Sequence, residues 1–211
     1  MKPPRVCGWV LGWAVPGRWF ADLVRVGWPE AEVRCFAPGP DLWPRLERAA
    51  PFDLLGGYSL GSHLLLADPG RAGRLAGAVS LAAPIWTFLR EGSAGGRVSR
   101  GKLRALRWAL GADAGEALRR FYRYAGLDAR PEDLADEERT ALEWGLDTLE
   151  RSALPPRLPA GWSACCGTED SLLDPVRLRE LVPELVLVPG ATHHPAGLLG
   201  VLADHPPHAN P

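Results

Sequence analysis

The sequence predicts an α/β fold in which a mostly parallel sheet carries helices on both faces and is interrupted by an all-helical insertion. Short apolar runs alternate with helical patterns in the first third of the chain and again near its end. Between them, residues 86–149 show helical periodicity without a strand signal. Strands separated by helices are typical of parallel sheets that are covered on both faces. We therefore divide the chain into a first part of the core (residues 1–85), a helical insertion (86–153) and a second part of the core (154–211).

The elements of the predicted core follow one another in a regular order. Apolar runs indicate buried strands at residues 5–10, 32–36, 52–55, 77–81, 162–166 and 185–188. Amphipathic patterns indicate helices at residues 19–26, 41–49 (capped by Asp41), 60–67 (ended by Pro69 and Gly70), 175–182 and 196–203. The proline-rich residues 154–159 are expected to lead back from the insertion, and residues 206–211 to form a frayed tail.

The charge balance and the hydropathy exclude several classes of function. The 211 residues carry 24 basic and 25 acidic side chains, which gives a formal net charge of −1. Nucleic-acid-binding domains usually carry a basic excess, so we expect no nucleic acid as a partner. No apolar run approaches the roughly 18 residues of a membrane span, and we expect no membrane association.

The cysteines indicate a reduced protein without a metal. The four cysteines form no C-x-x-C pair and have no histidine nearby at zinc spacing. Cys165 and Cys166 lie in an apolar run, where buried free thiols are expected. The apolar run near the N-terminus lacks a signal-peptide cleavage site, so we expect a cytoplasmic protein that needs neither metal nor cofactor.

Residues 57–61 carry the pattern most directly connected to chemistry. They read Gly-Tyr-Ser-Leu-Gly, a G-x-S-x-G pattern that directly follows an apolar strand and precedes an apolar helix. A nucleophile elbow requires this strand–turn–helix context, because the sharp turn exposes the serine at the carboxyl edge of the sheet. Ser59 is therefore the candidate nucleophile. The competing interpretation is a glycine-rich turn with an incidental serine.

A serine hydroxyl needs a base that removes its proton, so a histidine and an acid are expected later in the chain. Asp170 and His193 each follow a predicted strand and would lie at the same edge of the sheet as Ser59. In this arrangement the acid orients one imidazole nitrogen, and the other nitrogen accepts the serine proton. The sequence leaves competitors open: Glu169 and Asp174 for the acid, and His194 for the base.

Acyl transfer also requires N–H donors for the developing oxyanion. The backbone N–H of Leu60, directly after the candidate nucleophile, is one expected donor. The other is expected from Trp13, in the loop after the first strand, where Gly12 permits a tight turn. The side chain of Trp13 is expected either to line the acyl pocket or to pack in the core.

With these residues placed, the chain resembles the α/β-hydrolases and, among them, the carboxylesterases of biotin synthesis that demethylate pimeloyl-[acyl-carrier protein] methyl ester. Residues 12–15 (Gly-Trp-Ala-Val) with Trp19 are similar to that family's His-Gly-Trp-Gly loop and following tryptophan. Residues 57–62 (Gly-Tyr-Ser-Leu-Gly-Ser) resemble its Gly-Trp-Ser-Leu-Gly-Gly elbow. Residues 144–149, followed by 154–158, resemble its lid exit helix. Leu11 and Ser62 depart from the family pattern, which has histidine and glycine there.

This resemblance implies a reduced α/β-hydrolase fold, lacking the first two strands of the full sheet, with a helical lid. It implies a serine carboxylesterase that converts pimeloyl-[acyl-carrier protein] methyl ester to pimeloyl-[acyl-carrier protein] and methanol, with small esters as further substrates. Two other functions stay open on the sequence: a broad-specificity esterase or acyl thioesterase, and a non-catalytic binding protein with the hydrolase fold.

The charges of the insertion are unevenly distributed. Residues 97–130 contain nine basic and three acidic side chains, and residues 131–151 contain two basic and eight acidic ones. Either these two segments pair with each other, or the arginines bind an acidic partner. The resemblance implies that lid arginines bind the acidic acyl-carrier protein. The candidates are Arg119, Arg120 and Arg123, while Phe121, Tyr122 and Trp108 are expected to line the acyl channel or to pack the lid.

Overall fold

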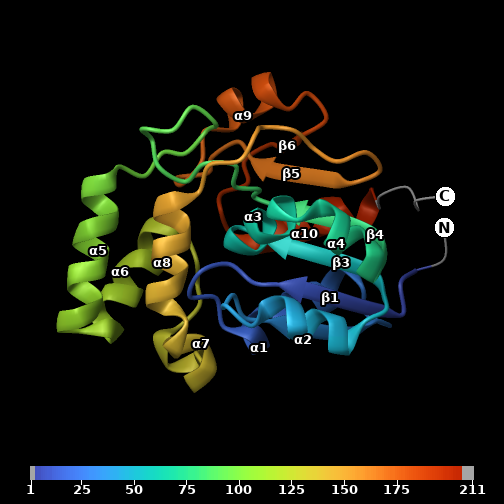
Figure 1. Ribbon diagram of the computed structural model, residues 1–211, viewed down its shortest axis with the longest axis horizontal. Coiled ribbons are helices and arrows are strands. Elements are labelled where there is room, and N and C mark those ends of the chain that lie inside the picture. Colours follow the sequence, from blue (N-terminus) through green and yellow to red (C-terminus); the bar gives the residue numbers. More distant parts are fainter. Residues whose placement is uncertain (1–2, 206–211) are drawn as a thin grey trace.

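A six-stranded parallel sheet forms the centre of the computed structural model, which describes residues 3–205 apart from the side chain of residue 137 (Figure 1). The strand order is β2-β1-β3-β4-β5-β6. The predicted α/β class is therefore confirmed, while the tail at residues 206–211 lies outside the described residues. The strands are β1 (Val6–Val10), β2 (Glu32–Phe36), β3 (Phe52–Tyr58), β4 (Ala76–Ala82), β5 (Ser163–Gly167) and β6 (Val186–Val188).

The central strand β3 is buried along almost its whole length because β1 and β4 flank it and helices cover it. Trp9 of β1 is fully buried and lies against Gly56 of β3, where a Cβ atom would collide with the indole ring. Gly56 thus admits a large aromatic side chain into the core. β3 extends three residues beyond its predicted end, and Ser59 follows it directly.

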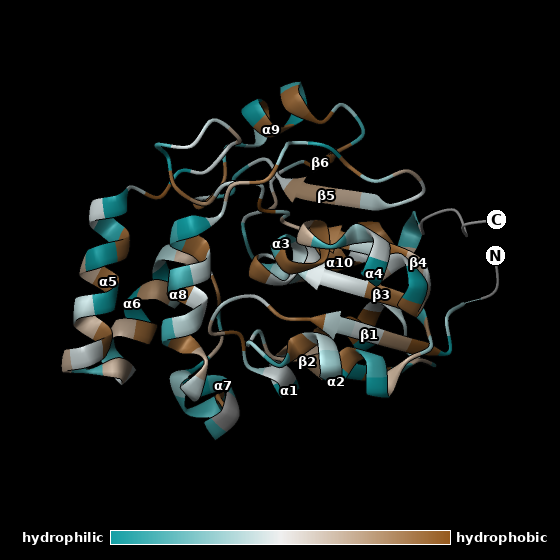
Figure 2. Ribbon diagram, in the orientation of Figure 1, coloured by the Kyte–Doolittle hydropathy of each residue, from teal (hydrophilic) through white to brown (hydrophobic). Residues whose placement is uncertain are grey.

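Helices cover both faces of the sheet. On one face α1 and α10 pack against each other, and on the other α3 and α4 lie over β3 and β4 (Figure 1). Figure 2 shows that α10 and β5 are predominantly hydrophobic, whereas hydrophilic residues recur along α5 and α7. The core helices are α1 (Gly17–Gly27), α2 (Leu42–Ala49), α3 (Leu60–Ala67), α4 (Pro69–Leu75), α9 (Pro175–Leu181) and α10 (Pro195–Asp204).

Four helices and a 3-10 turn lie between β4 and β5, beyond the carboxyl ends of the strands (Figure 1). We call this segment the insertion. Trp13 in the loop after β1 donates through Nε1 to the carbonyl oxygen of Leu142 over 2.8 Å, which joins the insertion to the core. The insertion contains α5 (Arg100–Ala112), α6 (Ala114–Ala125), the 3-10 turn Pro131–Asp133, α7 (Asp136–Thr140) and α8 (Leu142–Arg151).

The prediction of helix from residue 86 onward is wrong for residues 86–99, which form a loop. An isolated bridge between Leu89 and Val98 closes this loop. Gly95 has a φ of +82°, and a Cβ on Gly96 would collide with the carbonyl oxygen of Phe88. The left-handed φ of Gly95 and the close approach of Gly96 to Phe88 are incompatible with a continuous helix here.

Two predicted helix ends also differ from the structure. Asp41 precedes α2 but makes no capping hydrogen bond with its side chain; the carboxylate instead pairs with Arg45 at 3.1 Å. Pro69 does not simply end a helix, because it begins α4, where the Asp68 carboxylate accepts a hydrogen bond from the N–H of Arg71. Proline is tolerated there because the first helical N–H has no partner within the helix.

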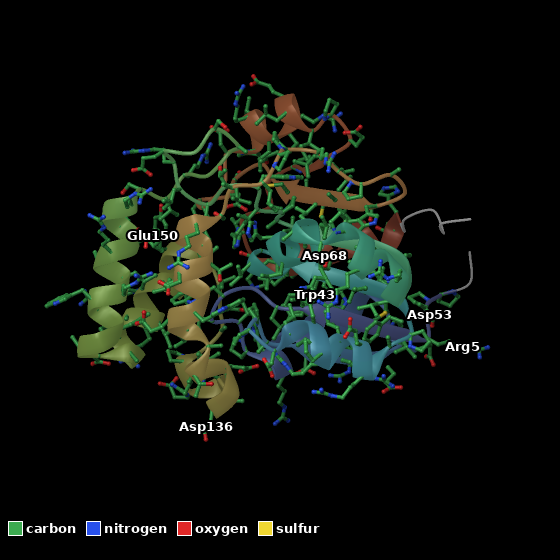
Figure 3. The ribbon with its side chains drawn as sticks, in the orientation of Figure 1. Arg5, Trp43, Asp53, Asp68, Asp136 and Glu150 are labelled. Atoms are coloured by element: carbon green, nitrogen blue, oxygen red, sulfur yellow. The ribbon has the colours of Figure 1, made fainter. Side chains whose placement is uncertain are left out.

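Polar contacts also secure the edge of the sheet opposite the insertion. The labels in Figure 3 place Arg5 and Asp53 together there. The Asp53 carboxylate accepts hydrogen bonds from the backbone N–H groups of Arg5 (2.7 Å) and Val6 (2.9 Å). The start of β1 is thereby held against β3.

The tight approach of α3 to β1 predicts a strong response to Gly61→Ala. The added Cβ would collide with the carbonyl oxygen of Val10, a backbone atom that cannot rotate away. We expect the free energy of unfolding to fall by about 3 kcal/mol, measured by urea denaturation. Gly73→Ala in α4 is the matched control because, apart from its chain neighbours and its own helix backbone, no atom lies within 4 Å of the Cβ position, and it should stabilise the protein slightly. Equal stability of the two variants would contradict this account of the turn.

Candidate active site

The turn between β3 and α3 holds Ser59 in an unusual conformation. Its φ of 54° and ψ of −115° lie outside the regions that L-residues normally occupy. A Cβ on Gly57 would lie 2.8 Å from backbone atoms of Ser62, so the turn closes only with glycine there. The Ser62 hydroxyl donates to the carbonyl oxygen of Gly57 over 2.7 Å and ties the turn together. This geometry is that of a nucleophile elbow.

Ser59, His193 and Asp170 form a continuous chain of hydrogen bonds. Ser59 Oγ lies 3.0 Å from His193 Nε2, and His193 Nδ1 lies 2.7 Å from Asp170 Oδ2. All three side chains are buried, with relative exposures of 7%, 1% and 0% for Ser59, His193 and Asp170. A hydroxyl, an imidazole and a carboxylate in this order can remove the serine proton and stabilise the resulting imidazolium.

Further hydrogen bonds hold Asp170 in place. Its second carboxylate oxygen, Oδ1, accepts from the backbone N–H groups of Leu172 (2.8 Å) and Leu173 (2.9 Å). Its backbone carbonyl oxygen accepts from Nη1 of Arg97 over 2.8 Å. One carboxylate oxygen is therefore occupied by the loop and the other is directed at His193. The loop after β5 provides this arrangement with main-chain donors.

Tyr58 positions His193, the middle member of this chain of hydrogen bonds. Its hydroxyl donates to the backbone carbonyl oxygen of His193 over 2.7 Å, and the two rings lie 5.4 Å apart. Burial, together with the negative charge of Asp170, raises the pKa of Tyr58 well above its usual value, so the hydroxyl stays protonated and can donate. This role was not predicted from the sequence, although Tyr58 directly precedes the candidate nucleophile.

The competing residues for the acid and the base make other contacts. Glu169 is exposed, and the Asp174 side chain accepts from the N–H of Arg177 at the start of α9 and pairs with Arg97 at 3.6 Å. His194 Nε2 lies 2.9 Å from Oδ1 of Asp128. The structure thus brings Asp170 and His193 to Ser59, and it brings none of the three competitors there.

Asp128 connects three segments beside the site. Besides contacting His194, its carboxylate accepts from Nε1 of Trp19 over 3.1 Å, and the Trp19 and His194 rings meet edge to face at 5.4 Å. The hydrogen bond from His194 is the main cause that lowers the pKa of Asp128. The insertion, α1 and the loop that carries His193 are therefore joined at one carboxylate.

The candidate oxyanion donors lie at the ends of β1 and β3. Leu60 is the first residue of α3, where backbone N–H groups have no partner within the helix. Among the backbone hydrogen bonds of the turns, loops and helix caps formed by residues 3–205, none has the N–H of Leu60 or of Trp13 as its donor. The Trp13 ring is buried and meets Phe121 edge to face at 4.7 Å. It therefore packs between the core and the insertion.

The predicted aromatic residues of the insertion have different environments. Tyr122 is buried and donates to the carbonyl oxygen of Ala14 over 2.7 Å, and Phe121 is half-buried against Trp13. The prediction for Trp108 is wrong: its side chain is 78% exposed, because α5 buries Leu103 and Leu110 instead.

Two groups of charged residues form ion pairs within the insertion. Arg107 lies between acidic residues of α8, 2.7 Å from Asp147 and 3.4 Å from Glu150, and Glu150 also lies 3.5 Å from Arg100. Figure 3 labels Glu150 on α8, on the side that faces α5.

The second group is an exposed arginine cluster on α6, formed by Arg119, Arg120 and Arg123. These residues surround Glu116 at 3.2, 2.9 and 3.9 Å respectively, and Arg119 also lies 3.4 Å from Glu132. The cluster therefore has a local positive excess on the surface of the insertion.

The cysteines are free thiols, and Cys7, Cys165 and Cys166 are buried. Burial raises the pKa of Cys165 to about 12, so this thiol stays protonated and unreactive at neutral pH. Among the described residues, no group of three or more His, Cys, Asp or Glu side chains could hold a metal ion. None of the helices formed by residues 3–205 is long and apolar enough to cross a membrane.

Comparison with solved structures identifies the architecture. A thermophilic esterase from Thermogutta terrifontis matches with a TM-score of 0.62 and 12% identity over 95% of this chain and 87% of that one. The 2-hydroxy-6-oxo-6-phenylhexa-2,4-dienoate hydrolase of Rhodococcus sp. strain RHA1 matches with a TM-score of 0.60 and 14% identity over 94% and 87%. The chain has the α/β-hydrolase fold.

A third α/β-hydrolase neighbour is the N-formylmaleamic acid deformylase of Pseudomonas putida S16, with a TM-score of 0.61 and 11% identity over 94% of this chain and 91% of that one. No protein-family model matches the chain, and no curated protein matches it in sequence. At these identities the likeness establishes the α/β-hydrolase fold, and the site residues carry the argument about function.

Tyr58→Phe tests how this α/β-hydrolase fold positions His193. Removing the hydroxyl leaves the buried carbonyl oxygen of His193 without its donor, and we expect the free energy of unfolding to fall by about 1–2 kcal/mol. For ester hydrolysis we expect kcat to fall about tenfold while KM changes little, because the lost contact holds the backbone of His193 and its imidazole would be displaced. Thermal denaturation and steady-state kinetics measure the two effects. A variant that changes only KM would contradict the positioning role.

Proposed function

We propose that the protein is a serine carboxylesterase whose nucleophile is Ser59. The observation that carries this proposal is the buried hydrogen-bonded chain Ser59–His193–Asp170 at a nucleophile elbow. Ser59 Oγ attacks the ester carbonyl carbon while His193 Nε2 takes the hydroxyl proton. The same proton passes to the leaving alcohol as the tetrahedral intermediate collapses to an acyl-enzyme. Water, deprotonated by His193, then releases the acid and regenerates the serine.

The backbone around the elbow stabilises the charge that develops in these steps. The N–H groups of Leu60 and Trp13 are proposed to hold the oxyanion. Leu60 begins α3, so the positive end of the helix dipole adds to this stabilisation. Asp170 keeps His193 in the tautomer whose Nε2 is free to accept the serine proton. The similar structures that are named as an esterase and other hydrolases support this chemistry by analogy.

As the substrate we propose an acyl ester on an acidic carrier, with pimeloyl-[acyl-carrier protein] methyl ester in biotin synthesis as the specific candidate. The exposed arginine cluster on α6 supports a carrier, because three guanidinium groups share Glu116. Such a cluster attracts an acidic surface and can bind carboxylate or phosphate bidentately. A broad-specificity esterase and an acyl thioesterase would use the same triad.

Hydrolysis of p-nitrophenyl butyrate by wild type and Ser59→Ala tests the proposed reaction. We expect the wild type to release p-nitrophenolate and Ser59→Ala to lose at least about 10³-fold in kcat/KM, because no other group in the chain of hydrogen bonds replaces the nucleophile. Ser93→Ala is the matched control, since Ser93 is exposed in the loop before α5. An inactive wild type would favour a non-catalytic binding protein, and full activity of Ser59→Ala would exclude Ser59 as the nucleophile.

Charge reversal tests the carrier. Arg119→Glu combined with Arg123→Glu should raise KM for the carrier-bound methyl ester about tenfold or more and leave KM for p-nitrophenyl butyrate unchanged. Arg48→Glu combined with Arg74→Glu changes the net charge equally on exposed positions of α2 and α4, and it should affect neither substrate. Equal losses for both substrates in the α6 variant would indicate damage to the insertion. Cleavage of carrier thioesters but not of methyl esters would contradict the biotin-synthesis substrate.

A further inference from the structure

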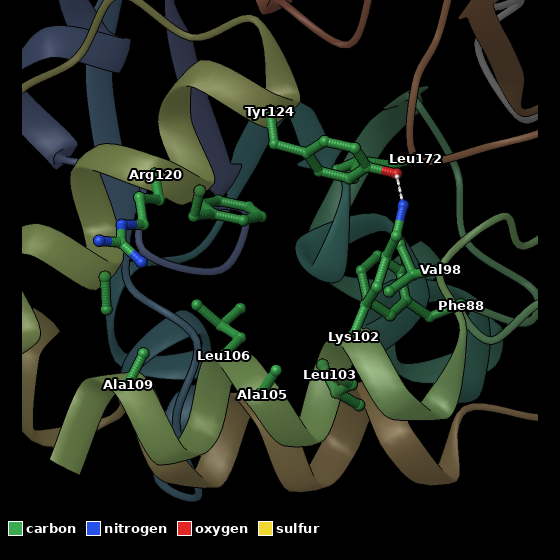
Figure 4. Close-up of a pocket in the computed structure, with 12 residues that line it drawn as sticks. Phe88, Val98, Lys102, Leu103, Ala105, Leu106, Ala109, Arg120, Tyr124 and Leu172 are labelled. Atoms are coloured by element: carbon green, nitrogen blue, oxygen red, sulfur yellow. Dashed lines mark hydrogen bonds between the residues drawn. The ribbon is translucent and has the colours of Figure 1, made fainter. Parts of the chain in front are cut away.

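A mostly apolar pocket of about 270 Å³ opens between α5 and α6 of the insertion. Figure 4 shows the space between these helices, with Leu106 and Ala109 of α5 on one side of it. The loop before α5 and the loop after β5 supply Phe88, Val98 and Leu172 to its wall. An apolar lining with a few polar groups is typical of sites for small organic ligands.

The polar groups of this pocket are mainly cations. Lys102 and Arg120 stand on opposite sides of the opening in Figure 4. Lys102 Nζ donates to the hydroxyl of Tyr124 over 3.2 Å and lies 4.7 Å from the ring centroid, and within the described residues it pairs with no carboxylate. Arg120 donates through Nε to Glu116 over 2.9 Å, and its side chain is 68% exposed. The pocket is thus suited to a ligand with an apolar body and an anionic end.

The volume of the pocket favours a small ligand. Sites for small organic molecules usually have volumes of about 300–1,000 Å³, and 270 Å³ lies just below that range. The pocket therefore suits a ligand with a short to medium aliphatic chain.

The pocket is separate from the triad but next to its supports. None of Ser59, His193 and Asp170 lines it. Phe121 forms part of its wall and also contacts Trp13 of the candidate oxyanion loop. Leu172 forms another part and donates its N–H to Asp170.

We propose that the pocket between α5 and α6 binds a medium-chain monocarboxylate. The aliphatic chain lies between the two helices, and Lys102 Nζ binds the carboxylate. This proposal concerns binding alone and does not depend on Ser59 acting as a nucleophile.

Isothermal titration calorimetry with octanoate tests the proposal on the full chain. We expect saturable binding of octanoate and at least tenfold weaker binding of octan-1-ol, which lacks the charge, and of acetate, which lacks the chain. Protein whose Ser59 has reacted with a phosphonate, and the Ser59→Ala variant, should bind octanoate as wild type does. Loss of binding in the phosphonylated protein would place octanoate in the triad site and overturn the proposal, as would absence of saturable binding.

Two substitutions test the location. Lys102→Met keeps the apolar stem and removes the charge, so it should weaken octanoate binding about tenfold and leave octan-1-ol binding unchanged. Arg104→Met makes an equal charge change at an exposed residue of α5 outside the pocket, and it should leave the binding of both ligands unchanged. Ala109→Phe should fill the pocket and abolish the binding of both octanoate and octan-1-ol, and thermal melting checks that the variant folds. If Ala109→Phe fails to fold, Lys102→Met against Arg104→Met decides. Octanoate binding that Lys102→Met leaves unchanged would refute the site.

Discussion

A buried hydrogen bond of 2.7 Å between His193 and Asp170 is the contact on which the rest of the candidate site depends. A fully buried carboxylate is costly unless it is paired and hydrogen-bonded. Here two backbone N–H groups of its own loop and the imidazole satisfy it. The loops after β5 and β6 are thereby fixed to each other, and His193 Nε2 is left directed at Ser59.

The parallel sheet explains why these groups meet. All strands run in the same direction, so the loops after β1, β3, β5 and β6 lie at one edge. Ala14, Ser59 and Ala83, which have positive φ values, follow β1, β3 and β4 at this edge. Such conformations cost free energy and persist only where the surrounding structure imposes them. The insertion covers the same edge, and Trp13 and Asp128 join it to the core.

The local sequence pattern was sufficient to predict the alternation of strands and helices. It was also sufficient to predict the nucleophile elbow, because G-x-S-x-G between an apolar strand and an apolar helix is typical of this sharp turn. The sequence could not exclude Glu169 in favour of Asp170 as the acid, because the backbone of the loop after β5 decides which of these two side chains is buried. The hydrogen bond from Tyr58 to His193 and the exposure of Trp108 depend on contacts between distant segments. The loop at residues 86–99 was missed because its glycines override a helical pattern of apolar residues.

The rate at which a fluorophosphonate modifies Ser59 tests most directly whether the buried His193–Asp170 pair activates this serine. Intact-mass spectrometry follows the reaction, and peptide mapping locates the adduct. The account predicts one adduct, on Ser59, formed about 10⁴-fold more slowly in Asp170→Asn and at the wild-type rate in Asp174→Asn. Equal rates in wild type and Asp170→Asn, or an adduct on another residue, would contradict it.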